Sequence, residues 1–179
     1  MPDASYLGSV YFKQGSNNLV VASGGQVSIE AGGALNDANG ALQRYVDVVI
    51  TSAQLLALNA TPRPLVAAPG AGRALVFEGA IFHKPAGTAY AGIASGEDLS
   101  VKYTDASGTE VGQCESGGFL DQTTAQTRYV RATTAASAST AVTPVANAAL
   151  VLNLLVGEIT TGDSPLNVRV FYREIPTVV

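Results

Sequence analysis

The segment from residue 147 to residue 175, NAALVLNLLVGEITTGDSPLNVRVFYREI, constrains the fold more than any other part of the chain. From 166 to 173 apolar and polar residues alternate, which is typical of a β-strand with one buried face. From 148 to 156 nearly every residue is apolar, as expected of a strand that is covered on both faces. The connector, 157–165, is rich in residues that favour turns, so the two strands are predicted to pair antiparallel.

Two strands alone are not stable in water, so further strands are needed beside them. Apolar runs with strand composition occur at 46–50, 65–66, 73–82, 99–114 and 127–133. The run at 65–66 is predicted as an edge strand because prolines flank it. The run at 99–114 is predicted as a hairpin that turns at Asp105–Gly108. Between the first two runs, Thr51 or Ser52 is expected to cap a short helical turn.

About eight short strands after residue 45, with little helix, predict an all-β fold built as an antiparallel β-sandwich. Eight strands favour a jelly-roll-like arrangement. A seven-stranded immunoglobulin-like sandwich is the alternative, although the chain lacks the pair of cysteines and the tryptophan that mark that fold.

Residues 1–45 are predicted to form an N-terminal arm for assembly, and residues 46–179 the sandwich. Apolar residues recur every eight positions in the arm, and Gly-Gly pairs precede two of them, which indicates short repeated β-rungs. A β-hairpin is the alternative. Neither structure can bury its apolar side alone, so the arm is expected to pack against a neighbouring molecule; covering one face of its own sandwich is the alternative. The predicted interaction residues are Tyr6, Tyr11, Phe12, Leu19, Val27 and Leu35.

The composition is poor in charge. Charged residues make up 13% of the chain, against about 25% in a typical soluble domain. This indicates that copies of the chain or a host structure cover much of the surface; a surface rich in Ala and Thr is the alternative. The net charge of −4 argues against nucleic-acid binding. Without a secretory pattern or an apolar run of roughly 18 residues, the protein is expected to be soluble, unsecreted and free of membrane contact.

No pattern of reactive residues stands out. His83 and Cys114 are the single histidine and the single cysteine, so neither a disulfide nor a site of several cysteines can form. A nucleophilic pair of these two is compatible with their spacing, but no supporting motif accompanies them. Gly70-Ala71-Gly72 lacks the third glycine of a dinucleotide loop. The acidic residues Glu97, Asp98, Asp121 and Asp163 lie in predicted turns. We therefore expect no enzyme activity, no cofactor and no metal.

Two segments resemble small structural proteins encoded by tailed phages. They are VDVVITSAQLLALNATPRPLVAAPGAGRALVFEGA at 46–80 and TTGDSPLNVRVFYREIP at 160–176. The resemblance implies a capsid decoration or cement protein with a jelly-roll fold, which binds the major capsid protein and stabilises the head shell. It also implies a homo-oligomer, with a trimer favoured, that is made in the host bacterial cytoplasm and lies on the capsid surface of the virion. The N-terminal arm departs from the common pattern.

A tail fibre, or another tail-associated protein that recognises a receptor or a carbohydrate, is the alternative function. Such a protein exposes aromatic side chains in loops, where they stack on sugars. Tyr90, in the loop 84–98, is the main candidate. Aromatic residues make up only 7% of the chain and tryptophan is missing, so we prefer the capsid interpretation.

Overall fold

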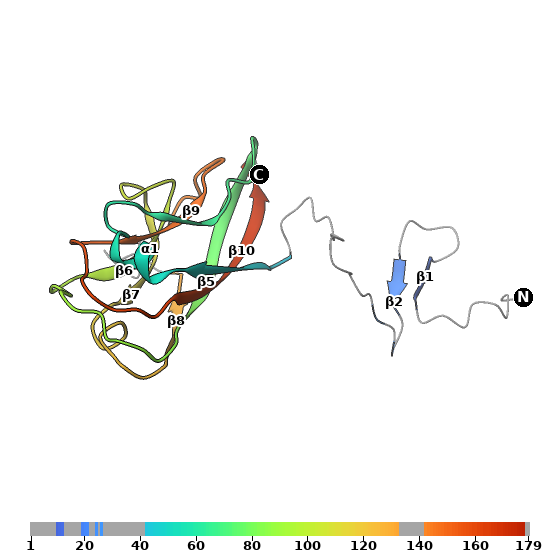
Figure 1. The fold of residues 1–179 in the computed structure, drawn as a ribbon. Coiled ribbons are helices and arrows are strands. Elements are labelled where there is room, and N and C mark those ends of the chain that lie inside the picture. Colours follow the sequence, from blue (N-terminus) through green and yellow to red (C-terminus); the bar gives the residue numbers. More distant parts are fainter. Residues whose placement is uncertain are drawn as a thin grey trace, which may run out of the picture. The chain divides into compact units, whose positions relative to one another are not determined.

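The structure is a computed structural model of the 179-residue chain. It describes residues 42–132 and 142–177, the backbone of 10–12 and 19–21, and positions 24 and 26. The chain divides into two compact units, Met1–Asn36 and Asp37–Val179. The second unit holds the strands from β3 to β10 and the helix α1 (Figure 1).

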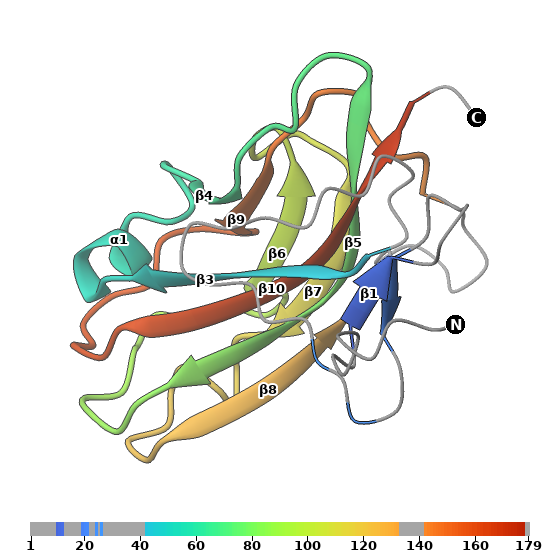
Figure 2. The ribbon, with the colours of Figure 1, turned by 90° about the vertical axis from the view of Figure 1, so that its right-hand side faces the viewer.

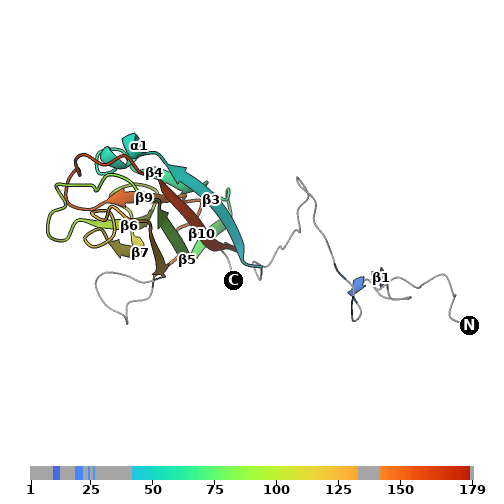
Figure 3. The ribbon, with the colours of Figure 1, turned by 60° about the horizontal axis from the view of Figure 1, so that its bottom comes forward.

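The strands of the second unit each overlap a run that the sequence predicts as a strand. They are β3 (Arg44–Ile50), β4 (Arg63–Val66), β5 (Arg73–Lys84), β6 (Asp98–Tyr103), β7 (Glu110–Glu115), β8 (Gln126–Arg131), β9 (Leu150–Leu154) and β10 (Leu166–Pro176). They form two four-stranded antiparallel sheets, β3-β10-β5-β8 and β4-β9-β6-β7. Figure 2 shows the first sheet with its strands side by side, and Figure 3 shows the second sheet beside it. The prediction of an antiparallel β-sandwich is confirmed.

The predicted pairing of the two C-terminal strands is wrong. β9 lies between β4 and β6, whereas β10 lies between β3 and β5 in the other sheet. The connector between them passes from one sheet to the other, and a β-bridge between Ala91 and Thr160 holds it on the way. Both strands are nevertheless inner strands of their sheets, and β9, whose residues are all buried, lies within one of the most apolar runs of the chain.

The core lies between the two sheets and receives side chains from both. Phe82 and Val170 come from the first sheet, Leu99 and Leu152 from the second, and all four are completely or almost completely buried. Burial of one such side chain contributes about 1.5–3 kcal/mol. Val151 and Asn153 point to the outer side of β9 but are buried too, so β9 is covered on both faces, as predicted.

The helix α1 (Ser52–Leu56) lies at one end of the sandwich, beside β3 and β4 (Figures 2 and 3). Thr51 caps it, as predicted, through a capping box. The Thr51 hydroxyl accepts from the Gln54 backbone N–H at 3.3 Å, and the Gln54 side-chain oxygen accepts from the Thr51 backbone N–H at 3.0 Å. After the helix, the Asn59 side-chain amide donates to the Leu154 carbonyl at 2.6 Å, which fixes the turn against the end of β9.

In the first unit, β1 (Val10–Phe12) and β2 (Leu19–Val21) form an antiparallel pair in which Tyr11 lies opposite Val20. Residues 27 and 35, on which the repeat hypothesis depends, lie outside the described residues. The choice between repeated rungs and a hairpin therefore stays a prediction.

Candidate functional site

On the outer face of the β3-β10-β5-β8 sheet the side chains are exposed or half-buried. In the middle of the other sheet's outer side, by contrast, Ser100, Val151 and Asn153 are buried. Strand register arranges the side chains on the outer face of the β3-β10-β5-β8 sheet in three rows that cross all four strands. We call this surface the open face. Its rows are Val49–Asn167–His83–Thr127, Asp47–Arg169–Ile81–Tyr129 and Tyr45–Phe171–Gly79–Arg131.

Aromatic side chains cross the open face in its second and third rows. Tyr45 on β3 and Tyr129 on β8 are each 62% exposed, and Phe171 on β10 is half-buried between them. The Tyr129 ring leans over Gly79, since a Cβ on that glycine would lie 3.0 Å from the tyrosine hydroxyl oxygen. Glycine at position 79 therefore makes room for the ring, and aromatic surface extends from one edge strand to the other.

An ion pair lies beside the aromatic residues. Arg169 Nε and Nη2 donate to the two Asp47 carboxylate oxygens at 2.7 and 2.8 Å. The same guanidinium lies over the Tyr45 ring, 4.7 Å from its centroid. The hydrogen bonds from Arg169 lower the pKa of Asp47, so the carboxylate stays charged and paired near neutral pH. The pair neutralises the centre of the face.

A shallow hollow of about 270 Å³ opens on this face. It is lined by Asp47, Val48, Val49, Ile81, Asn167, Val168 and Arg169. Apolar walls with a carboxylate, an amide and a guanidinium at one side are the usual composition of a small-ligand site. The hollow is continuous with the exposed aromatic surface, because Tyr45 packs on the same Arg169.

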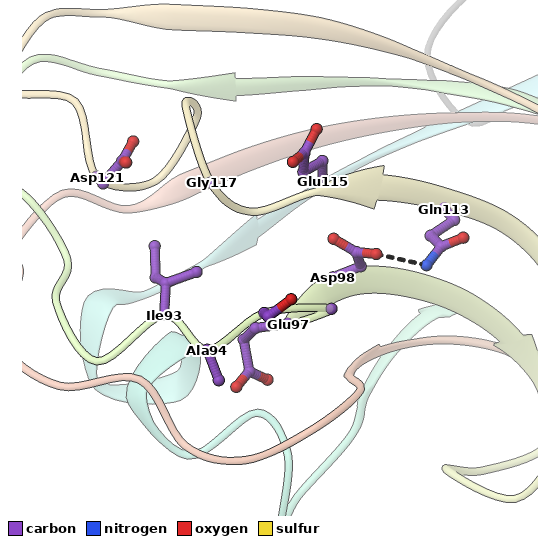
Figure 4. Close-up of a pocket in the computed structure, with 10 residues that line it drawn as sticks. Ile93, Ala94, Glu97, Asp98, Gln113, Glu115, Gly117 and Asp121 are labelled. Carbon is purple, nitrogen blue, oxygen red and sulfur yellow. Dashed lines mark hydrogen bonds between the residues drawn. The ribbon is translucent and has the colours of Figure 1, made fainter.

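A second hollow, of about 550 Å³, lies between the 93–98 loop, β7 and the turn that follows β7 (Figure 4). Several of its lining residues are acidic, but two of them have structural partners. Glu97 accepts from the backbone N–H groups of Val156 and Gly157, and Asp98 accepts from the Gln113 side chain at 2.6 Å. Within the described part of the chain, no group of three His, Cys, Asp or Glu side chains is placed to hold a metal ion.

The two residues that could have formed a nucleophilic pair lie in opposite sheets. His83 on β5 faces outward, and its Nδ1 is 2.9 Å from the Thr127 hydroxyl. Cys114 on β7 is buried, and its thiol donates weakly to the Glu115 carbonyl. Burial raises the pKa of Cys114 to about 11, so the thiolate is scarce at neutral pH. His83 and Cys114 therefore hydrogen-bond to different partners and not to each other.

The prediction that Tyr90 is exposed in a loop, where it could stack on a sugar, is wrong. Tyr90 is buried, and its hydroxyl donates to the Ser164 carbonyl at 2.6 Å. Burial also raises its pKa to about 12. Among the tyrosines whose side chains the structure describes, Tyr45 and Tyr129 are the exposed ones, and they lie on strands rather than loops. Their exposure could have been predicted from the sequence, because both tyrosines occupy outward positions of alternating strands, where polar residues are usual.

The interaction residues predicted for the N-terminal arm cannot be compared with the open face. The structure gives only backbone positions for Tyr11, Phe12 and Leu19, on β1 and β2. Tyr6, Val27 and Leu35 lie outside the described residues. Their proposed role stays a prediction.

In comparisons with known proteins, no family model, no curated protein and no solved structure matches this chain. In the described residues no helix is both long enough and apolar enough to cross a membrane.

Proposed function

We propose that this protein is a structural component of a tailed-phage virion, without catalytic activity. In this proposal it is a capsid decoration or cement protein that binds the major capsid protein, stabilises the head shell, and acts as a homo-oligomer with a trimer favoured. It would be made in the host bacterial cytoplasm and end on the capsid surface. The resemblance of residues 46–80 and 160–176 to phage structural proteins supports this proposal.

The order of the strands supports the jelly-roll part of the proposal. From β3 to β10, every connection between consecutive strands passes from one sheet to the other, except the β6–β7 hairpin. Eight strands in two sheets of four are the arrangement of a jelly roll, a fold found in viral capsid proteins and in lectins. Because one fold hosts many functions, this order supports the capsid proposal only together with a binding surface.

The open face is the observation that carries the proposal. Tyr45, Val49 and Tyr129 are among the most exposed large apolar side chains of the described residues, and all three lie on it. Exposed apolar surface of this kind marks binding sites, and tyrosine is favoured at the centre of protein interfaces. The charges of Asp47 and Arg169 compensate each other, so a partner can cover them without leaving a single buried charge.

The proposal is tested by adding the purified protein to phage heads that lack it and sedimenting the heads. We expect the protein to sediment with the heads and to stay bound in about 1 M salt, because screening weakens ionic contacts far more than apolar ones. Failure to sediment with heads at low salt would refute the capsid proposal, and release by moderate salt would refute the apolar mode of binding.

The alternative of a tail-associated carbohydrate-binding protein gains one observation. Tyr45 and Tyr129 can stack on sugar rings, and Asp47, Asn167 and Arg169 in the adjacent hollow can bond to hydroxyl groups. Titration with purified surface polysaccharide of the host tests this alternative. Because the chain has seven tyrosines and no tryptophan, intrinsic tyrosine fluorescence reports the binding directly.

A further inference from the structure

We propose that the open face binds the open face of a second copy of the chain, across a twofold axis that runs parallel to the strands. The contact goes beyond the proposed function and does not depend on it, because two copies in solution are sufficient to form it. It occupies the face that the capsid would bind, so it forms between copies that are free of the capsid. The inference rests on how the two edges of the face complement each other.

The edges of the open face carry different chemistry. The β3 edge offers an aromatic ring, a carboxylate and an aliphatic side chain, from Tyr45, Asp47 and Val49. The β8 edge offers a cation and two hydroxyl groups, from Arg131, Tyr129 and Thr127. Arg131 is exposed, and its guanidinium forms no ion pair or hydrogen bond with the side chains or backbone of the described residues. An unpaired arginine beside exposed aromatic surface needs a partner when that surface is covered.

A twofold axis parallel to the strands, placed between β10 and β5, supplies that partner. It exchanges β3 with β8 and β10 with β5, and it keeps each row opposite itself. Arg131 then faces Tyr45 of the second copy, a cation over an aromatic ring. An isologous contact repeats every such pair twice.

The inner strands fit in the same arrangement. Phe171 on β10 meets the Tyr129 ring of the second copy, which covers Gly79 on β5. In the first row, Asn167 meets His83, whose Nδ1 is engaged with Thr127 and whose Nε2 is the ring nitrogen left for the amide. An aromatic side chain therefore opposes an aromatic ring, and polar side chains oppose each other.

The other face-to-face twofold axis, in the plane of the sheets but across the strands, gives a poorer match. It keeps each strand opposite itself and reverses the rows, so Arg131 faces Thr127 and Tyr45 faces Val49. Arg131 would then be covered without an anion or an aromatic ring. The chemistry of the edges therefore selects the axis parallel to the strands.

The size of the face sets the expected strength of the contact. Strands lie roughly 5 Å apart and alternate residues advance about 7 Å, so four strands and three rows cover on the order of 400 Å² per copy. Stable interfaces bury about 800 Å² per partner. We expect the contact to be weak in dilute solution and to become populated at high protein concentration.

Cross-linking between two single-cysteine variants tests the geometry. Val49→Cys and Thr127→Cys are made in full-length Cys114→Ser protein, which leaves Tyr45 and Arg131 intact. The axis parallel to the strands places Val49 of one copy opposite Thr127 of the other. A bis-maleimide that spans the roughly 10 Å between packed sheets should link a mixture of the two variants. Neither variant alone should cross-link, because like positions are separated by three strand spacings.

Sedimentation at high concentration tests the energetics. Arg131→Glu and Tyr45→Ala should each weaken self-association about tenfold, since each removes a contact that occurs twice. Glu115→Gln, an exposed change in the other sheet, should have no effect. The proposal would be overturned if either cysteine variant cross-linked alone. It would also be overturned if all variants associated equally, or if the wild-type protein did not self-associate. A wild-type monomer whose open face binds host polysaccharide would overturn it too.

Discussion

At the scale of single residues, Glu97 shows how a loop carboxylate becomes structural. The sequence places it in a solvated turn, yet the residue is only 2% exposed. Its Oε1 accepts from the backbone N–H groups of Val156 at 3.1 Å and Gly157 at 3.0 Å. Two backbone donors at the start of the crossing between the sheets are thereby satisfied. A carboxylate is the strongest acceptor that a side chain offers to such donors.

We expect Glu97→Ala to lower the free energy of unfolding by on the order of 2 kcal/mol, because it leaves both N–H groups without a partner. Urea denaturation followed by circular dichroism measures the loss. Glu115→Ala is the matched control, since Glu115 is an exposed carboxylate nearby in the sequence. An equal effect of the two substitutions would show that the Glu97 bonds contribute nothing.

Cys114 predicts a dependence of stability on alkaline pH. Its pKa is about 11 in the folded chain, against an ordinary value of 9.0, because burial disfavours the thiolate. Between these values the folded chain binds more protons than the unfolded chain, so the free energy of unfolding falls as the pH rises from about 9 to about 11. Urea midpoints below pH 9 and near pH 11 should show a smaller fall for Cys114→Ser than for the wild type. Parallel falls would contradict the burial of the thiol.

Individual residues also show what the sequence could not reveal. Tyr90 was expected to be exposed because it lies in a loop. It is buried, and its hydroxyl donates to the carbonyl of Ser164, which is 74 residues away in the sequence. Lys84 was read as the start of a loop, whereas its ammonium group donates to the Gln122 carbonyl at 2.7 Å inside the protein. Such contacts depend on how loops from both sheets meet, which no local pattern encodes. Tyr45 and Tyr129 were overlooked although their outward positions could be read from strand alternation.

At the scale of elements, the alternation of side chains located the strands well and their partners poorly. The period of two places β10 from Leu166 onward, and the capping residue Thr51 places α1. Pairing is a different question, because a turn-rich connector suits a hairpin and a crossing between sheets equally. The connector 155–165 crosses, and the contacts that steer it, such as the Ala91–Thr160 bridge, lie far apart in sequence.

The position of β9 as an inner strand leads to a test of the core. Leu152 is completely buried, so Leu152→Ala should lower the free energy of unfolding by about 2–5 kcal/mol, and Leu152→Asp should prevent soluble expression. Thr161→Asp is the control, since Thr161 is exposed and its positive φ of 53° is tolerated by aspartate. Soluble, stable Leu152→Asp protein would show that the core is misplaced.

At the scale of the whole molecule, the chain divides into two compact units, and we propose that the first serves assembly while the second is the folded scaffold. We expect deletion of residues 1–40 to leave a folded sandwich that unfolds cooperatively in urea, because β3 begins only at Arg44. The deleted form should lose the trimer, measured by sedimentation equilibrium, if the N-terminal arm carries Tyr6, Tyr11 and Phe12 to a neighbour. A trimer that survives the deletion would remove the assembly role from the arm.

The most direct measurement is the copy number of this protein in purified virions, determined by quantitative mass spectrometry against the major capsid protein of the same sample. Heads and tails are separated before the analysis, so that the location is measured together with the amount. We predict a copy number of the same order as that of the major capsid protein, found in the head fraction. A protein confined to the tail fraction, or missing from the particles, would contradict its role as a structural component of the phage head.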